Sequence, residues 1–524
     1  MSTDTDSDAV AVSGVTYQRA EAGYFDKRQL QRSAGVWGLW GIGVAAVISG
    51  DFSGWNFGIG VAGWGGFVIA SLIVIAMYIM MIESISEMSA AMPHTGGAYS
   101  FSRAAMGPWG GFVTGLAETI EYVMTTAVVI YFSAQYADAI LTELGGPSLI
   151  DAGFAWAWWL VLYAIFVALN SAGAEASFTF AIVVAVMSVA ILALFGIVAV
   201  ASGSVDLASL WDIAPTTGDS AFLPFGVAPI LFAMPFAMWL FLGIEELPLA
   251  AEEAHNPERD IPRAGRWGMI TLILTGAVVV VLNPAVLGST TAGGADAPLL
   301  DGFSAMIPGN IAAILSAFAL VGLLASVQGI MFAAGRNMYS LSRAGYYPKF
   351  LSLTGARKTP YIALLVSALI GFLALFIVQF GGETAGSVVL NMAVWGAVLS
   401  YLLQMTAFVL LRYRFPQAKR PHVSVFGIPV ALIAGLISAA IFVGVLLNPD
   451  YTAAIYTVVG LYVLALVYFA FAGRHRLVLS PEEEYAITGG LLEGPNPDDL
   501  AESQECVRSL LAGVELDDGP ASAD

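Results

Sequence analysis

Stretches of about 20 apolar residues recur along the chain, and each is long enough to cross the hydrocarbon core of a bilayer. We place twelve of them, near 35–60, 64–88, 100–142, 155–171, 176–201, 222–250, 266–288, 309–340, 360–380, 386–411, 427–447 and 452–473. Only 11% of the residues are charged, whereas soluble domains carry about 25%. The sequence therefore predicts an all-α polytopic membrane protein. The third stretch is too long for a simple span, so we expect it to begin as a kinked or shallow segment.

The lysines and arginines give the expected orientation. Loops on the cytoplasmic side carry an excess of these residues. All 20 lie in the N-terminal segment, in the tail, or in and beside the loops that follow even-numbered spans. One span more or fewer would destroy this alternation. We therefore predict twelve spans in the cytoplasmic membrane, with both termini inside the cell.

Three regions follow from this pattern. Residues 1–34 form a polar cytoplasmic segment, and residues 35–473 form the domain of twelve spans, with repeats near 35–201 and 222–411. Residues 474–524 form an acidic tail, which carries much of the formal net charge of −19. The tail is rich in Gly and Pro and poor in aromatics, so we expect it to be disordered. A partner-binding role and a plain solvated tail both remain open.

Two spans contain helix-weakening residues. The stretch "VISGDFSGWNFG" (47–58) places Asp51 among three glycines, and span six holds four prolines and Gly243. Irregular backbone at membrane depth is tolerated only against protein or a water-filled cavity. Interruptions at matching places in two five-span halves point to the binding site of an inverted-repeat transporter. Close helix packing through GxxxG units is the alternative for span one. We predict a five-plus-five inverted repeat with spans one and six broken, followed by two C-terminal helices.

Acidic residues lie deep in three spans, at Asp51, Glu118, Glu121, Glu245 and Glu246, and no Lys or Arg lies in the central part of any span. A charge at the bilayer centre is costly unless it faces a cavity or a partner. Several of these acids must therefore be protonated, hydrogen-bonded or paired with a mobile cation. This favours a cationic substrate or a coupling ion, although a structural hydrogen bond remains possible for each acid. Aromatic side chains, which can bind ammonium groups but also pack ordinary spans, flank these acids: Phe52, Trp55, Tyr122, Trp239 and Phe241.

Three loop motifs resemble the amino acid–polyamine–organocation (APC) superfamily of secondary transporters, which have the LeuT-like fold. They are "PHTGGAYSFSRAAMG" (93–107), "EEAHNPERDIPRA" (252–264) and "GRNMYSLSRAGYYPKFLS" (335–352). The resemblance covers about residues 20–475. Within the superfamily, "SGDFSGWNFG" (49–58) together with "GLAETIEYV" (115–123) resembles ethanolamine permeases more closely than amino acid exchangers.

The resemblance implies a substrate site at the two breaks. By position, Ser49, Gly50, Asp51 and Phe52 are expected at the first break, and Trp239, Phe241, Gly243 and Ile244 at the second. In relatives that carry amino acids, backbone amides at the first break hold the substrate carboxylate. Asp51 departs from that pattern, because it would repel a carboxylate and would pair with an amine. The substrate-binding residues expected by position and depth are Ser49, Gly50, Asp51, Phe52, Trp55, Glu121, Tyr122, Trp239, Phe241, Gly243, Ile244 and Glu245.

Coupling is left open by the sequence. Span five lacks the lysine that replaces sodium in some relatives. A sodium ion near Ser326 and a proton on Glu118, Glu121 or Glu245 are both compatible with the sequence. No cofactor and no structural metal are expected.

We predict a transporter that takes up a small organic amine, ethanolamine before others, by alternating access. An amino acid or polyamine permease of the same superfamily is the main alternative. A membrane enzyme would need a catalytic constellation, and the four histidines lie scattered in polar loops. A channel would need a continuous pore with a selectivity filter, and a sensor that signals through the tail is left open. We expect the lipid bilayer and the substrate as partners and no nucleic acid. The oligomeric state is not set by the sequence.

Overall fold

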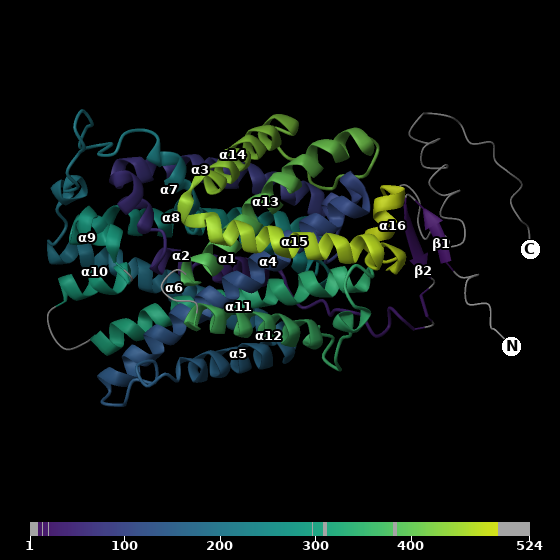
Figure 1. Cartoon of the computed structure of the whole chain (residues 1–524), viewed down its shortest axis with the longest axis horizontal. Coiled ribbons are helices and arrows are strands. Elements are labelled where there is room, and N and C mark those ends of the chain that lie inside the picture. Colours follow the sequence, from purple (N-terminus) through teal and green to yellow (C-terminus); the bar gives the residue numbers. More distant parts are fainter. Residues whose placement is uncertain are drawn as a thin grey trace, which may run out of the picture.

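The helices of the chain run side by side in one elongated bundle (Figure 1). The computed structural model describes residues 9–12, 14–18, 20–21, 23–295, 297–307, 312–380 and 385–490. One end of the bundle carries a small sheet and the last described helix, and we call it the sheet end. Its elements are β1 (Ala9–Val12), β2 (Val15–Gln18), β3 (Leu477–Val478) and α16 (Pro481–Thr488). The short helices α9 (Ser289–Gly294) and α10 (Pro298–Met306) lie at the opposite end.

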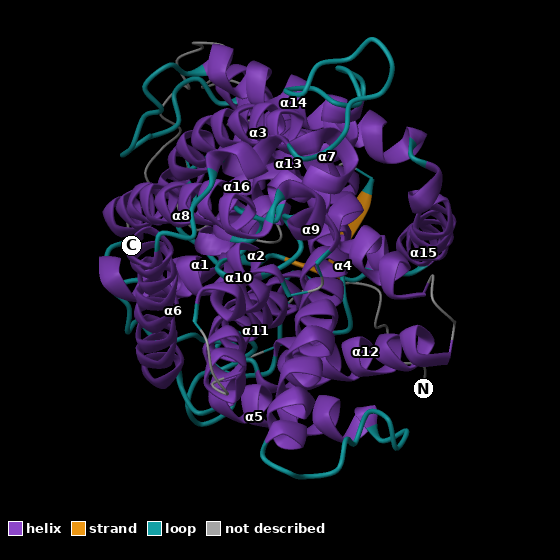
Figure 2. Cartoon of the chain, turned by 90° about the vertical axis from the view of Figure 1, so that its left-hand side faces the viewer, coloured by secondary structure: helices purple, strands orange, loops and turns teal. Residues whose placement is uncertain are grey.

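Helices form most of the described chain, as Figure 2 shows. The remaining α-helices are α1 (Val36–Val47), α2 (Ser49–Phe52), α3 (Phe57–Ala91), α4 (Gly97–Glu143), α5 (Ala155–Ser171), α6 (Ala174–Ser202), α7 (Pro229–Met238), α8 (Pro257–Leu287), α11 (Ala312–Arg343), α12 (Tyr361–Phe380), α13 (Ala385–Arg414), α14 (Ile428–Leu447) and α15 (Thr452–Phe471). Short 3₁₀ helices are η1 (Leu207–Trp211), η2 (Ile244–Glu253), η3 (Lys349–Ser352), η4 (Pro449–Tyr451) and η5 (Gly473–His475). The predicted all-α class is confirmed.

The membrane-length helices coincide with the apolar stretches of the sequence. In the described part of the chain, eight helices are long and apolar enough to cross a bilayer. Shorter apolar helices occupy Val36–Phe52, Ala155–Ser171, Pro229–Met238 and Tyr361–Ile377. Each of these segments overlaps a predicted span, and Phe57–Ala91, which covers the second span, also includes the last residues of the first. The twelve-span topology and the inverted repeat stay predictions.

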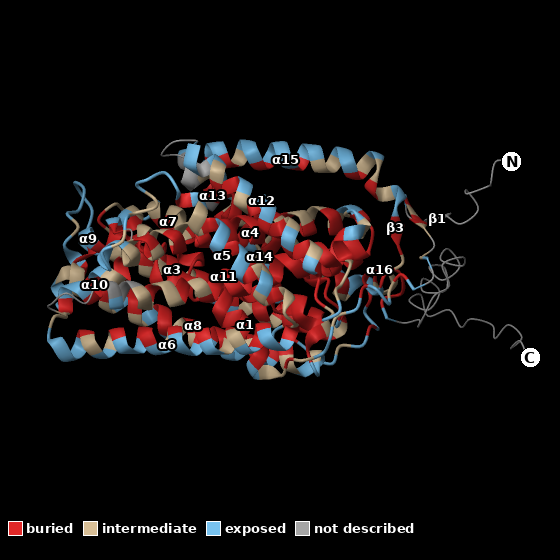
Figure 3. Cartoon of the chain, turned by 90° about the horizontal axis from the view of Figure 1, so that it is seen from below, coloured by how far each residue is buried: buried red, intermediate tan, exposed pale blue. Residues whose placement is uncertain are grey.

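Burial separates a protein-facing interior from an apolar outer surface (Figure 3). Helix α4 packs against both α11 and α13 and is largely buried. The outer faces of α6 and α15 are exposed and apolar, for example at Val200 and Leu464, which are 68% and 70% exposed. Such faces fit contact with lipid chains, because lipid tails are as apolar as these side chains.

Two long helices bend at glycines in the left-handed region. In α3 the bend is at Gly63, with φ of 72°, and it separates the residues after the first break from the following long span. In α4 it is at Gly107, with φ of 79°, followed by Pro108. Glycine adopts positive φ without the steric cost of a Cβ atom. The expected kink near the start of the third span therefore lies at Gly107.

The first part of the tail is folded, so the prediction of disorder is wrong for residues 474–490. Strand β3 pairs in parallel with β2, and α16 packs against α4. Glu482 and Glu483, near the start of α16, are fully buried. From the composition of the tail, such acids are expected to be exposed to solvent. In the structure, arginines of the bundle bind both of them. The rest of the predicted tail lies outside the described residues.

Candidate transport site

The first break begins after the short helix α2 and does not include that helix. Ser49–Phe52 form the short helix α2, and the chain becomes extended at Ser53, with φ of −162° and ψ of 159°. Gly54 has φ of 95°, and α3 begins at Phe57. The expected break at 49–52 is therefore displaced to 53–56. Close packing of an unbroken helix, the alternative for this span, does not describe the structure.

Asn56 holds the first break in place. Its Nδ2 donates to the carbonyl oxygens of Ala292 and Ala295 at 2.8 and 2.7 Å, and its Oδ1 accepts from the Gly54 amide at 3.1 Å. The extended residues thus gain polar partners from the α9 region. Such partners are required where a helix opens at membrane depth.

Ser326 of α11 binds both sides of the turn between α1 and α2. Its hydroxyl accepts from the Ser49 amide at 3.0 Å and donates to the Ala45 carbonyl at 2.8 Å. A hydroxyl has one donor and two acceptor positions, so one acceptor position remains.

The second break lies where the sequence indicates it. Helix α7 ends at Met238, and η2 begins at Ile244. Gly243, with φ of 112°, donates its amide to Oε2 of Glu245 at 3.0 Å. Helix α2, just before the first break, touches the second break, because a Cβ atom on Gly50 would overlap the carbonyl group of Trp239. Only glycine permits this crossing.

Four glutamates form a buried cluster beside the second break. Glu118 and Glu121 come from α4, and Glu245 and Glu246 come from η2. The carboxyl of Glu121 lies against that of Glu245, with Glu118 and Glu246 as its further acidic neighbours. Neither oxygen of Glu121 or Glu246 has a hydrogen-bond partner of good geometry among the described residues. We call these four residues the glutamate cluster.

Asp51 lies apart from the glutamate cluster. Its side chain is 1% exposed and lies beside Thr275 and Gly276 of α8. Both of its oxygens lack a hydrogen-bond partner of good geometry in the described part of the chain. Thr275 is its polar neighbour, and none of the four glutamates acts on it. The sequence treats these acids as one site, whereas the structure has two acidic centres.

Some of the expected aromatic residues lie beside an acidic centre or a break, and others only pack against neighbouring side chains. The Phe241 ring lies 5.5 Å from that of Tyr78, beside the glutamate cluster, and the Trp239 ring lies beside Gly54. Trp55 packs on Phe67 with ring centroids 5.8 Å apart.

Three other expected site residues are occupied by protein contacts. The Tyr122 hydroxyl donates to Glu118 at 3.2 Å instead of reaching Glu121. The side chain of Ile244 packs between Gly43 and Gly268, and the Phe52 ring packs on Gly322. Ile244 and Phe52 thus serve helix packing in this conformation.

Sequence reasoning missed four polar residues at the two centres. Tyr78 and Tyr401 join their hydroxyls at 3.1 Å and face Glu245. Ser400 lies beside Glu118, and Thr275 beside Asp51. The available signal was a polar run inside an apolar span, "SYLLQ" at 400–404, where two of these residues stand together.

Most of the chain matches the model of one protein family. The model of the amino acid permease family matches residues 38–477. The chain belongs to this family. Membership in a transporter family, together with the apolar helices, makes the permease a multi-pass membrane transporter for a small organic substrate.

The chain is similar to three relatives over most of each relative's own length. An uncharacterized transporter of Rhizobium meliloti (strain 1021) is 28% identical over 461 residues, 86% of this chain and 94% of its own. The L-asparagine permease of Salmonella typhimurium is 24% identical over 76% of this chain and 80% of its own. The gamma-aminobutyric acid permease of Escherichia coli (strain K12) is 28% identical over 64% and 71%. The two substrates named for these relatives both carry a carboxylate, and the first relative has no named substrate.

Proposed function

We propose that this permease is a secondary active transporter of a small organic amine without a carboxylate, with ethanolamine as the first compound to test. The two breaks would close around the amine, and the sheet end, rich in arginines, would face the cytoplasm. One observation carries the proposal. Within the described residues, no Lys or Arg forms an ion pair with Asp51, Glu121 or Glu245.

An ammonium group supplies what these acids lack. A buried carboxylate without a partner is costly, and an opposite charge within about 4–6 Å favours its ionised form. Ethanolamine also has a hydroxyl, which can bond the tyrosine pair Tyr78 and Tyr401. Aromatic faces such as those of Trp239 and Phe241 add roughly 0.5–2 kcal/mol for a cation that lies over them.

The second break already contains a carboxylate of the protein. Glu245 accepts the amide of Gly243, so a backbone donor of the break is used internally. A substrate carboxylate would compete with Glu245 for this donor and would meet like charge at Asp51. This arrangement favours an amine over an amino acid.

An amino acid permease is the second candidate, and the L-asparagine and gamma-aminobutyric acid permeases among the relatives favour it. Its substrate carboxylate would need donors away from both acidic centres. A polyamine would instead use Asp51 and the glutamate cluster together, with one amine at each.

Uptake of radiolabelled ethanolamine into proteoliposomes tests the proposal. Wild type is compared with Asp51→Asn, and with the exposed Asp151→Asn as a matched control. Excess ethanolamine, choline, putrescine, alanine and lysine serve as competitors. We expect competition by ethanolamine alone and loss of uptake only in Asp51→Asn. Competition by alanine or lysine that survives in Asp51→Asn would make the protein an amino acid permease and Asp51 a structural residue.

The coupling ion is tested in the same vesicles. Sodium is replaced by potassium in one arm, and a protonophore removes the proton gradient in another. Dependence on sodium would assign an ion near Ser326 and the adjacent carbonyls. Dependence on the proton gradient would assign a carboxyl of the glutamate cluster.

A further inference from the structure

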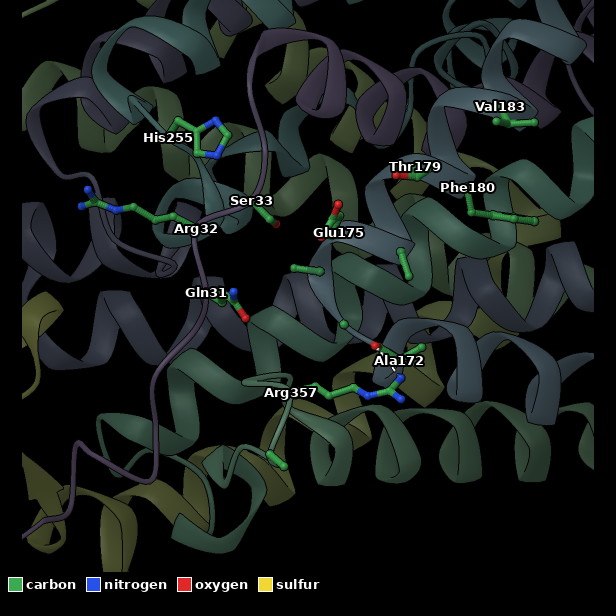
Figure 4. A pocket seen from close by; sticks show the side chains of 14 residues that line it. Gln31, Arg32, Ser33, Ala172, Glu175, Thr179, Phe180, Val183, His255 and Arg357 are labelled. Atoms are coloured by element: carbon green, nitrogen blue, oxygen red, sulfur yellow. Dashed lines mark hydrogen bonds between the residues drawn. The ribbon is translucent and has the colours of Figure 1, made fainter.

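A hollow of about 1140 Å³ lies at the sheet end, away from both acidic centres. The segment before α1, the loop between α5 and α6, and the segment before α12 surround it (Figure 4). Arg32, His255, Arg357 and Glu175 are its titratable residues. All four are exposed, so a ligand can reach them without unfolding.

The charges around this hollow are not balanced by the protein. Arg32 has no ion pair or side-chain hydrogen bond with a described residue, and Glu175 pairs with neither arginine. Arg357 donates through Nη1 to the Ala172 carbonyl at 2.7 Å, which leaves further N–H groups free. Two guanidinium groups against one carboxylate make the hollow positive.

Backbone donors line the same hollow. Helix α6, 29 residues long, begins there with Gly173 at its N-cap and without a side-chain cap. The first N–H groups of a helix have no partner within it and carry a partial positive charge. With the arginines, they provide donors that suit a phosphate group.

The other wall is apolar and continues along the lipid-facing surface. Phe180 and Val183 line the hollow, and Val183 is 51% exposed. Val186 and Met187, one turn further on α6, are 51% and 44% exposed. Trp37, 63% exposed at the start of α1, is the residue type that marks a membrane interface. The hollow thus has a cationic wall next to an apolar surface that can contact a hydrocarbon chain.

We propose that this hollow binds the phosphodiester headgroup of an anionic membrane lipid, with an acyl chain along the outer face of α6. Basic pockets between spans at the membrane surface suit such headgroups. Glu175 would accept a hydrogen bond from a headgroup hydroxyl, which favours a glycerol headgroup over a bare phosphate. Bound lipid would connect the segment before α1 to α6 and to the segment before α12. The proposal does not depend on which substrate is transported.

Lipid binding to the purified full-length protein in detergent tests it. Native mass spectrometry measures retention of dioleoyl phosphatidylglycerol, with dioleoyl phosphatidylcholine and inorganic phosphate in parallel arms. The variants are Arg32→Gln/Arg357→Gln, the charge-preserving Arg32→Lys/Arg357→Lys, and Arg259→Gln/Arg263→Gln as a control. The control removes the same charge from exposed arginines of α8 outside the hollow. Melting temperatures without added lipid confirm that each variant is folded.

We expect wild type to retain phosphatidylglycerol over phosphatidylcholine, and the glutamine pair in the hollow to bind phosphatidylglycerol at least about tenfold more weakly. The lysine pair should retain most of the binding, and the α8 control should match wild type. Equal losses in the α8 control would overturn the site in favour of general surface charge. Equal retention of both lipids would overturn anionic selectivity. Competition by inorganic phosphate at concentrations comparable to those of the lipid would identify a soluble anion as the occupant and overturn the lipid.

Discussion

Two sets of buried carboxylates occupy different parts of this permease. The central set comprises Asp51, Glu118, Glu121, Glu245 and Glu246, and the sheet-end set comprises Glu253, Glu482 and Glu483. None is more than 3% exposed. Each sheet-end acid has an arginine, from Arg336, Arg343 and Arg103, at 2.8, 2.6 and 2.8 Å respectively. The central acids have no such ion pair among the described residues.

Burial alone therefore does not show whether an acid has a structural or a functional role. Where the protein supplies the cation, a buried acid joins segments of the chain and has a structural role. Where it does not, a proton, a metal ion or a substrate must balance the charge. The same residue type at the same burial thus has two roles, separated by the origin of its counter-ion.

Glu483 should show the largest effect on stability. It accepts from Nε of Arg103 at 2.8 Å and from the hydroxyls of Tyr17, Tyr99 and Tyr346 at 2.6, 2.9 and 3.0 Å. Glu483→Ala leaves Arg103 buried and unpaired, which costs about 3–5 kcal/mol. Thermal unfolding of the detergent-solubilised protein should show a large drop, whereas the exposed Glu258→Ala should match wild type. A melting temperature unchanged in Glu483→Ala would remove the structural role from the sheet-end set.

Neutralising an acid of the central set should lower uptake and leave the melting temperature unchanged, in contrast to the loss of Glu483. Glu121→Gln removes a carboxyl that faces Glu245 and other acids, so we expect no loss of melting temperature. Uptake of the substrate should fall at least about tenfold, the effect of losing roughly 1.4 kcal/mol of interaction. Uptake and thermal unfolding are measured on the same preparation. A variant that melts lower but transports normally would place Glu121 with the structural acids.

Glu246→Gln sharpens this test within the glutamate cluster. Both oxygens of Glu246 lack hydrogen-bond partners in the described structure. Repulsion by Glu245 outweighs attraction by Arg336, which already pairs with Glu253, so the change to an amide removes a net repulsion. The melting temperature should stay equal to that of wild type or rise. A clear drop would reveal a partner that holds Glu246 in its charged form.

Acid should loosen the sheet end through Glu482. Burial alone would raise the pKa of this carboxyl, but Arg343 and His94 outweigh it and lower the pKa from 4.5 to about 2. Because the folded pKa is the lower one, the contribution to stability is present above about pH 4.5 and is lost as the pH falls toward 2. Hydrogen exchange of α16 should rise over this window in wild type. Glu482→Gln should exchange faster at neutral pH and lose most of that pH dependence.

Ser326→Ala should give the smallest effect. The hydroxyl joins the Ser49 amide to the Ala45 carbonyl, so its loss costs about 1–2 kcal/mol of stability. If a sodium ion binds there, the sodium concentration for half-maximal uptake should also rise. An unchanged sodium response together with a lower melting temperature would leave Ser326 with a structural role alone.

The sequence could predict what depends on local pattern. Span positions follow from apolar length, and the second break follows from Pro235 and Gly243. The bend at Gly107 follows from the excess length of the third span. Such features need no knowledge of distant contacts.

Features that depend on distant contacts could not be predicted. Glu483 and Arg103 are 380 residues apart in the chain, and composition gives no sign that they meet. Asp51 lies beside α8 because the crossing of Gly50 and Trp239 fixes how α2 is turned. The two tyrosines beside the glutamate cluster, Tyr78 and Tyr401, likewise come from separate helices, α3 and α13.

Equilibrium binding of radiolabelled ethanolamine to purified protein tests the central claim most directly. Wild type is compared with Asp51→Asn and Glu121→Gln from the central set and with Glu482→Gln from the sheet end, each with its melting temperature. The account predicts that the two central variants lose binding and keep their stability, while Glu482→Gln loses stability and binds normally below its melting temperature. Central variants that bind ethanolamine as wild type does, or that lose stability as Glu482→Gln does, would contradict it.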